Sequence, residues 1–204
     1  MKITILTDTH WRYTFPHEGD LPFGEDVFYL GDNVELVNFK KQHLLETLEF
    51  GEWFYKKCFE TNTVAVKGNH EGGLYRWLST NHDIEVPVNV VKEINGKRVL
   101  FCHGLHNWKT KRVQKWWDKP LKPDTLFGSK FLKSMFSKSL HGARKLWPKK
   151  KWSRKQRRNN LEIMKQYDVD ILIQGHVHPT RLIDETHDGK RMICCMQGKT
   201  ILDI

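Results

Sequence analysis

The sequence predicts an α/β fold, a sandwich with mixed sheets, and two observations support that prediction. Short apolar runs rich in β-branched residues recur along the chain, and each ends at glycine or polar residues, as buried strands do. Stretches with apolar residues at helical spacing lie between these runs. With 204 residues, we expect one domain over 1–204 that carries a sizeable insertion.

Five apolar runs are predicted strands, and polar residues follow each of them directly. They cover 2–7 (KITILT), 26–30 (DVFYL), 63–67 (TVAVK), 98–102 (RVLFC) and 170–174 (DILIQ).

Helical spacing predicts two helices, over 39–59 and 156–167, with Gly51 as a predicted break in the first. The dipeptides Asn95-Gly96 and Asp188-Gly189 separate runs of strand-like sequence, so each predicts a hairpin turn. The order of strands, helices and hairpins therefore fits the sandwich.

The positive charge is concentrated in one segment. The chain has a net charge of +10, but residues 105–160 hold 18 of its 34 Lys and Arg and only two acids. That segment also shows no strand alternation and is rich in Trp, Ser and Pro. We interpret it as an inserted, partly helical basic cap, whose charge indicates an anionic partner.

The composition excludes a membrane-spanning protein, because no stretch approaches about 20 apolar residues. The N-terminal run turns polar after six residues, so we do not expect a signal peptide. The four cysteines form no CxxC pair and are predicted to be reduced, buried thiols. These features predict a cytoplasmic protein, with peripheral membrane binding through the basic cap as an open alternative.

Metal-ligating side chains follow the predicted strands. Because ligand sites in open α/β sheets gather at the carboxyl ends of the strands, we expect these side chains to share one cleft. Mixed Asp, Asn and His ligation suits Mn²⁺, Fe²⁺ or Zn²⁺ better than Mg²⁺ or Ca²⁺, and Mn²⁺ is our first choice. Two such ions could clamp a phosphoester displacement and acidify a shared water. The predicted ligands are Asp8, His10, Asp32, Asn69, His103, His176 and His178.

His70 follows Asn69 directly, and we predict that it is catalytic, protonating the leaving oxygen or steadying the phosphoryl group. Glu71 is expected to hold the His70 ring in the required tautomer. Gly68, Gly72 and Gly73 around them predict a tight, permissive turn.

Five sequence blocks resemble, in order, the motifs of the calcineurin-like metallophosphoesterase superfamily. The blocks are Asp8-x-His10, Gly31-Asp32-Asn33, Gly68-Asn69-His70-Glu71, His103-Gly104 and Gly175-His176-x-His178. The resemblance implies a two-sheet αββα sandwich and an enzyme that hydrolyses a phosphomonoester, phosphodiester or pyrophosphate through metal-bridged hydroxide. It assigns Asp8, His10 and His178 to one ion. It assigns Asn69, His103 and His176 to the other, with Asp32 as the bridge.

The motifs also bear on the branch of the superfamily. Asn33-Val34-Glu35 follows Asp32 without the arginine of the protein Ser/Thr phosphatases, which counts against that branch. The lid position is similar to that of UDP-2,3-diacylglucosamine pyrophosphohydrolases, but those enzymes typically have Arg where this chain has His70. Repair-type nucleases of the superfamily use the Asn-His pair, yet their extra domains are absent from this sequence.

The basic cap leaves several partners open. Its cations and aromatic residues suit nucleic acid, an anionic membrane surface or a diphosphate substrate. Four cations are candidates for binding substrate: Arg12, Arg76, Lys149 and Arg154. For the first two, a surface ion pair is an equal interpretation. A nucleic-acid-directed phosphodiesterase and a non-catalytic binding scaffold are the alternatives to a general phosphoesterase.

Overall fold

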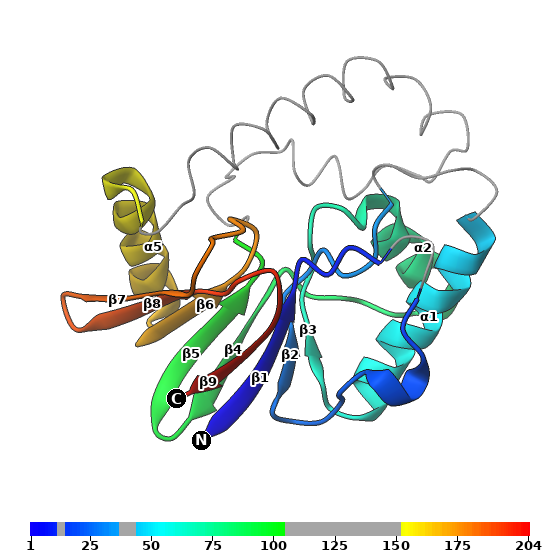
Figure 1. Ribbon diagram of the computed structural model, residues 1–204, viewed down its shortest axis with the longest axis horizontal. Helices are drawn as coiled ribbons and strands as arrows, with labels where there is room; N and C mark the ends of the chain where they lie inside the picture. The colour runs from blue at the N-terminus through cyan, green and yellow to red at the C-terminus, as the bar shows by residue number, and fades with distance from the viewer. Residues whose placement is uncertain (12–14, 37–43, 105–151) are drawn as a thin grey trace, which may run out of the picture.

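In the computed structural model, two β-sheets pack face to face, with helices on both outer faces (Figure 1). The structure describes residues 1–11, 15–36, 44–104 and 152–204. The helices are α1 (Leu44–Glu60), α2 (Gly72–His82), α5 (Arg154–Tyr167) and the short 3₁₀ helix η1 (Glu18–Asp20). The strands are β1 (Lys2–Thr7), β2 (Val27–Tyr29), β3 (Val64–Ala65), β4 (Asn89–Ile94), β5 (Lys97–Cys102), β6 (Ile171–Gln174), β7 (Ile183–His187), β8 (Lys190–Cys194) and β9 (Gly198–Asp203).

Both sheets are mixed, and their central strands run parallel. The first sheet has the order β3-β2-β1-β9, in which only β9 is antiparallel to its neighbour. The second has the order β4-β5-β6-β8-β7, with antiparallel strands at both edges. The carboxyl ends of β1, β2, β3, β5 and β6 therefore meet at one end of the sandwich (Figure 1).

Alternation along the strands builds three apolar layers. Ile3, Ile5 and Phe28 of the first sheet face the second sheet, where the Phe28 ring stacks on Phe101 with centroids 4.0 Å apart. Tyr29, next to Phe28, points the other way and packs under α1 and α2. On the far side, α5 covers the second sheet. The layer order is thus αββα, and the predicted fold class is confirmed.

Helix α1 runs without interruption through Gly51, so the predicted break there is wrong. Gly51 is buried against α2, and a Cβ at this position would lie 2.8 Å from a Leu74 methyl carbon. The glycine therefore provides space for close helix packing rather than a stop.

The five predicted strands and both hairpins are present in the structure. The predicted helix over 156–167 is also present and begins slightly earlier, at Arg154. Helix α2 and strand β9 are present as well and were not predicted from the sequence. Most of the predicted basic cap, residues 105–151, lies outside the described residues. Among the helices in the described ranges, none has the length and apolar character needed to cross a membrane.

Candidate metal centre

The predicted ligands lie together in space at the carboxyl ends of five strands. Asp8 follows β1, Asp32 follows β2, and His103 follows β5 directly. The loops after β1 and β2 are joined by backbone hydrogen bonds, such as the 3.0 Å bond from His10 N–H to the Asp32 carbonyl. Five of the predicted ligands have left-handed backbone, with φ between 45° and 64°: Asp8, His10, Asp32, His176 and His178. Such strained conformations often cluster at functional sites.

A first group of three ligand atoms comes from Asp8, His10 and His178, and these atoms all lie within 4.8 Å of one another. His178 Nε2 is 2.8 Å from Asp8 Oδ1. The other carboxylate oxygen of Asp8 accepts hydrogen bonds from the Thr7 hydroxyl at 2.8 Å and from the His176 backbone N–H at 2.9 Å. These bonds fix the Asp8 carboxylate with one oxygen directed at the histidine.

A second group comes from Asp32, His103 and His176, again within 4.8 Å. His103 Nε2 lies 3.1 Å from Asp32 Oδ2, 3.1 Å from Asn69 Oδ1 and 3.0 Å from His176 Nδ1. His103 Nδ1 donates to the Leu30 carbonyl at 2.7 Å. That bond assigns the proton to Nδ1 and directs Nε2 toward the other ligand atoms, as in many metal-binding histidines.

The structure corrects the predicted partner of His70. Its Nδ1 lies 2.9 Å from both carboxylate oxygens of Glu35, not against Glu71. Glu35 Oε2 is also 3.1 Å from His10 Nδ1, so one fully buried carboxylate faces two histidines. His70 Nε2 lies 3.8 Å from Asp32 Oδ2, and its side chain is 27% exposed, so the ring can meet a substrate. The sequence signal for Glu35 was an acid within an otherwise apolar Val34–Leu36 run.

Glu71 instead holds the loop that carries Asp32. Its carboxylate accepts the backbone N–H groups of Asp32, Asn33 and Val34 at 2.9, 2.7 and 3.1 Å. It also accepts the Tyr75 hydroxyl at 2.6 Å. Because Glu71 is completely buried, these bonds replace the water that the carboxylate would otherwise need.

Two glycines allow the loops to approach one another. A Cβ on Gly68 would lie 2.0 Å from the Asp32 nitrogen, and one on Gly175 would lie 2.0 Å from Thr7 Oγ1. Gly72 and Gly73, by contrast, begin helix α2, so the prediction that they form part of the turn is wrong.

The local electrostatics favour the charged forms of Asp8 and Asp32, whereas burial raises the pKa of Glu71. Burial opposes the charge on Asp8, but His178 and His103 hold the pKa of that carboxyl well below its usual range. Burial also lowers the pKa of His103, yet Asp32 and Asp8 outweigh it and raise the pKa to about 9. Burial and the neighbouring His103 lower the pKa of His176 to about 4. For His70, burial is outweighed by Glu35 and Asp32, so its pKa is raised.

The donor set fits divalent ions of the Mn²⁺, Fe²⁺ and Zn²⁺ kind. Carboxylate oxygens and imidazole nitrogens converge from several directions, and the tautomer of His103 is set for ligation through Nε2. The two groups of ligand atoms have no residue in common, and a third group, His10, Asp32 and His70, shares residues with both. Asp32 Oδ2 lies near both His103 and His70.

The four predicted substrate-binding cations are not part of the ligand cluster in the described residues. Arg76 is exposed on α2, and Arg154 is exposed at the start of α5. Arg12 and Lys149 lie outside the described residues.

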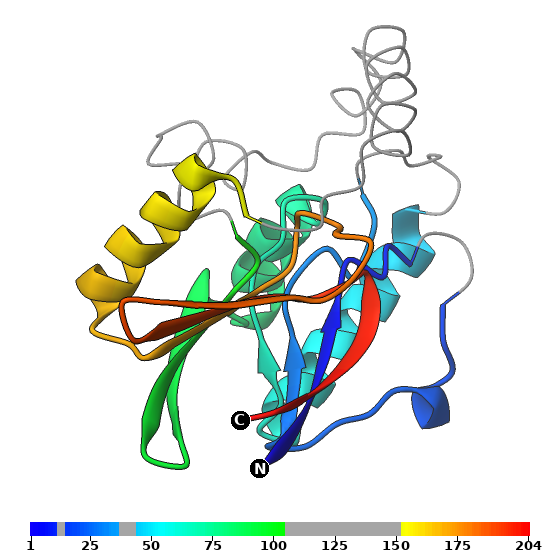
Figure 2. The same ribbon diagram turned by 60° about the vertical axis from the view of Figure 1, so that its left-hand side comes forward.

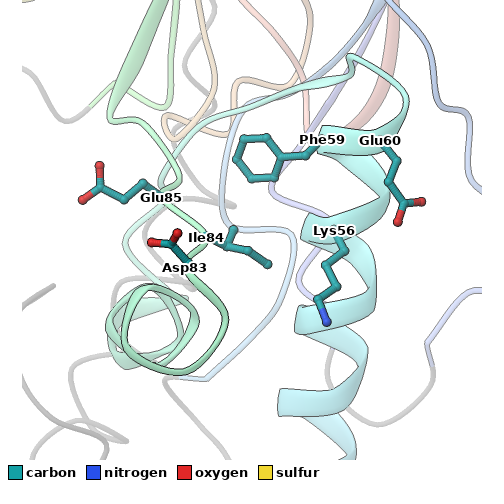
Figure 3. A pocket seen from close by; sticks show the side chains of 6 residues that line it. All are labelled: Lys56, Phe59, Glu60, Asp83, Ile84 and Glu85. Atoms are coloured by element: carbon teal, nitrogen blue, oxygen red, sulfur yellow. The ribbon is translucent and has the colours of Figure 1, made fainter.

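A separate surface groove of about 540 Å³ lies between the end of α1 and the segment that follows α2 (Figure 3). It is lined by Lys56, Phe59, Glu60, Asp83, Ile84 and Glu85. None of the predicted ligands lines it. Because α1 ends just before β3 begins, the groove lies at the opposite end of the sheet from the ligand cluster.

Comparisons with known proteins show which family and which solved structures the chain is similar to. A family model described as calcineurin-like phosphoesterase matches residues 1–180. Similar solved structures include Vps29 from Cryptosporidium parvum (16% identity, TM-score 0.43, covering 96% of this chain and 74% of that one). Vps29 from Entamoeba histolytica complexed with Zn²⁺ has 14% identity and a TM-score of 0.42, covering 97% and 74%. An archaeal phosphodiesterase has 16% identity and a TM-score of 0.40, covering 97% and 84%. No curated protein matches the chain.

Proposed function

The chain belongs to the calcineurin-like phosphoesterase family, and we propose that it is an active hydrolase of phosphoester bonds that uses two divalent metal ions. The observation that supports this most directly is the completeness of the ligand cluster. Every predicted ligand position holds a metal-binding side chain, and two groups of three converge within 4.8 Å. A complete ligand set supports catalysis over a binding scaffold in which ligand positions have been replaced.

In this proposal, Asp8, His10 and His178 hold one ion. Asn69, His103 and His176 would hold the second, and Asp32 would serve both ions. Bound there, the ions would supply an acidified water and positive charge against the phosphoryl oxygens. We take Mn²⁺ as the preferred ion, with Fe²⁺ and Zn²⁺ as competitors for the same mixed donors.

His70 is proposed as the general acid. Although burial opposes it, Glu35 and Asp32 raise the pKa of His70 and so favour the protonated ring, in which Nε2 can give a proton to the leaving oxygen. Glu35 accepts from Nδ1 at 2.9 Å and orients the ring with Nε2 toward Asp32. Glu71 and the Asp8 contacts hold the ligand loops in place, so the residues need little rearrangement during the reaction.

The test uses purified, Mn²⁺-loaded protein with bis-p-nitrophenyl phosphate and p-nitrophenyl phosphate as substrates. Asp32→Ala should abolish turnover and reduce the bound metal. His70→Ala should retain two metal ions per chain by mass spectrometry but lower kcat by about 10²–10⁴-fold, the usual contribution of a general acid. His17→Ala, an exposed histidine outside the cluster, is the matched control.

Metal content decides the role of His70, because His10, Asp32 and His70 also form a group within 4.8 Å. Loss of an ion in His70→Ala would make His70 a ligand. Turnover equal to that of the parent would remove it from the mechanism. A parent protein that binds Mn²⁺ but hydrolyses neither substrate would refute the proposed activity on small phosphoesters.

A further inference from the structure

Helix α5 begins with a charge pattern that does not favour the helix itself. Four of its first five residues are cations, and its first turn contains no acid. The amino end of a helix carries partial positive charge, so cations there are unfavourable for the helix. The helix is instead held by a capping box, in which Ser153 Oγ accepts from the Gln156 N–H at 3.2 Å.

Three of these cations are exposed: Arg154, Lys155 and Arg158, called the α5 basic patch below. Arg157 differs, because its Nη2 lies 2.8 Å from Glu185 Oε2 on β7. Within the part of the chain that the structure describes, no carboxylate lies within ion-pair distance of the patch. Among the described residues, the positive charge of the patch is therefore not neutralised by a carboxylate.

The α5 basic patch lies close to the candidate metal centre. Trp152, two residues before Arg154, is 3% exposed and packs against Ile183, Cys194 and Val177. Val177 stands between His176 and His178 in the chain. Helix α5 runs antiparallel to β6 in both views, so its first turn lies at the same end of the sandwich as the ligand cluster (Figures 1 and 2). The loop from His178 to β7 adds a further exposed cation, Arg181.

The surroundings of the patch favour a polyanion in water over a lipid bilayer. Ile163 and Met164 of α5 are buried against the second sheet, and Leu161 and Tyr167 are partly buried beside them, so the helix presents no fully exposed apolar side chain to a membrane. The large apolar side chains that are exposed in the described residues all lie on other elements: Met1, Leu45, Phe59, Val91 and Ile201. Surface-bound membrane helices need an exposed apolar face beside their cations, which α5 lacks.

We propose that the α5 basic patch binds the sugar–phosphate backbone of a single-stranded nucleic acid whose scissile phosphate lies at the candidate metal centre. The inference rests on the proposed function and narrows its substrate to a phosphodiester chain. A flexible single strand can follow the cations and still bring one phosphate down to the deeply buried Asp8 and Asp32.

The test is anisotropy of fluorescein-labelled oligo(dT) with the full chain in EDTA, so that binding is measured without cleavage. Arg154→Gln/Lys155→Gln/Arg158→Gln is compared with a control of equal charge, Lys2→Gln/Lys97→Gln/Lys165→Gln. The control lysines are exposed and lie at the amino ends of β1 and β5 and near the end of α5, away from the ligand cluster. Circular dichroism checks that both variants are folded.

Each phosphate contact to a single strand contributes about 0.7 to the slope of log affinity against log salt. Loss of three contacts should therefore reduce the slope by about 2 and weaken binding on the order of 50-fold at 0.15 M KCl, with the control close to the parent. Equal losses in both variants, or none in the patch variant, would overturn the proposal. So would a patch variant that loses binding to phosphatidylserine vesicles but keeps oligo(dT).

The proposed activity is measured separately from binding to the α5 basic patch, because bis-p-nitrophenyl phosphate is too small to contact the patch while its phosphate lies at the metal centre. A parent protein that binds oligo(dT) through the patch but does not hydrolyse that substrate would refute the activity and support the binding surface. A parent that hydrolyses it but does not bind oligo(dT) would refute the binding surface alone.

Discussion

Removing the Tyr75 hydroxyl should destabilise the protein through the ligand loops. This buried hydroxyl donates to Glu71 Oε2 at 2.6 Å and accepts from the Gly68 N–H at 2.7 Å. Tyr75→Phe deletes both bonds without creating a large cavity. Each deletion that deprives a buried polar group of a partner costs about 1–3 kcal/mol, so we expect the free energy of unfolding to fall by about 2–6 kcal/mol.

Tyr55→Phe is the matched control, because Tyr55 is also buried and also reaches Glu71. Its hydroxyl is 3.3 Å from Glu71 Oε1 and 3.4 Å from the Tyr75 hydroxyl, close to the upper limit for hydrogen bonds. We therefore expect a loss of about 1 kcal/mol or less.

Urea unfolding of the metal-free proteins measures the difference, read from the midpoint at constant slope. Thermal melting should agree, since 1 kcal/mol corresponds to about 2–4 °C for a chain of this size. The reasoning fails if the two variants lose equal stability or if Tyr55→Phe loses more. Calorimetry should also show weaker Mn²⁺ binding for Tyr75→Phe, because Glu71 then holds the Asp32 loop less firmly.

Three further predictions concern the same region. Glu35→Gln should lower kcat/KM for bis-p-nitrophenyl phosphate by about 10- to 100-fold, because His70 loses a charge-assisted bond of about 1.5–3 kcal/mol; an unchanged value would exclude Glu35 from positioning His70. Gly175→Ala should abolish Mn²⁺ binding in calorimetry, since its Cβ would meet Thr7 Oγ1, whereas Gly19→Ala has open space and should bind like the parent. Despite its burial, Glu35 has its pKa held below the usual 4.5 by His10 and His70. The contribution of Glu35 to the stability of the folded state is therefore complete above pH 4.5 and is lost as the pH falls. At pH values below about 4.5, the melting temperature of the metal-free protein should decrease, and it should decrease less steeply in Glu35→Gln.

The fold and the positions of the ligands could be predicted because both depend on local signals. A buried strand ends where apolar residues give way to polar ones, and parallel strands bring such ends together without any knowledge of detailed packing. Asp8, Asp32 and His103 are therefore placed by the strands that precede them. Strand β9 could not be predicted in this way, because Thr200 and Leu202 are buried while Ile201 between them is exposed, so its residue types do not alternate in polarity along the strand.

The missed features depend on contacts between distant parts of the chain. Nothing near Glu35 in the sequence indicates that histidines from two other loops meet its carboxylate. Glu71 was predicted to hold the ring of the neighbouring His70. The Glu71 side chain instead binds a loop that lies 37 to 39 residues earlier in the chain. Helix α2 begins with two glycines, which are poor helix formers, so tertiary packing decides that helix rather than propensity.

The bonds that Glu71 makes to the Asp32 loop have a consequence for how an ion would be captured. All of these bonds join protein groups to one another, so the ligand loops hold the same shape before and after an ion binds. Loading should therefore be limited by how fast the ion sheds water, not by movement of the chain. Repeated cycles of chelation and refilling should return the same protein each time.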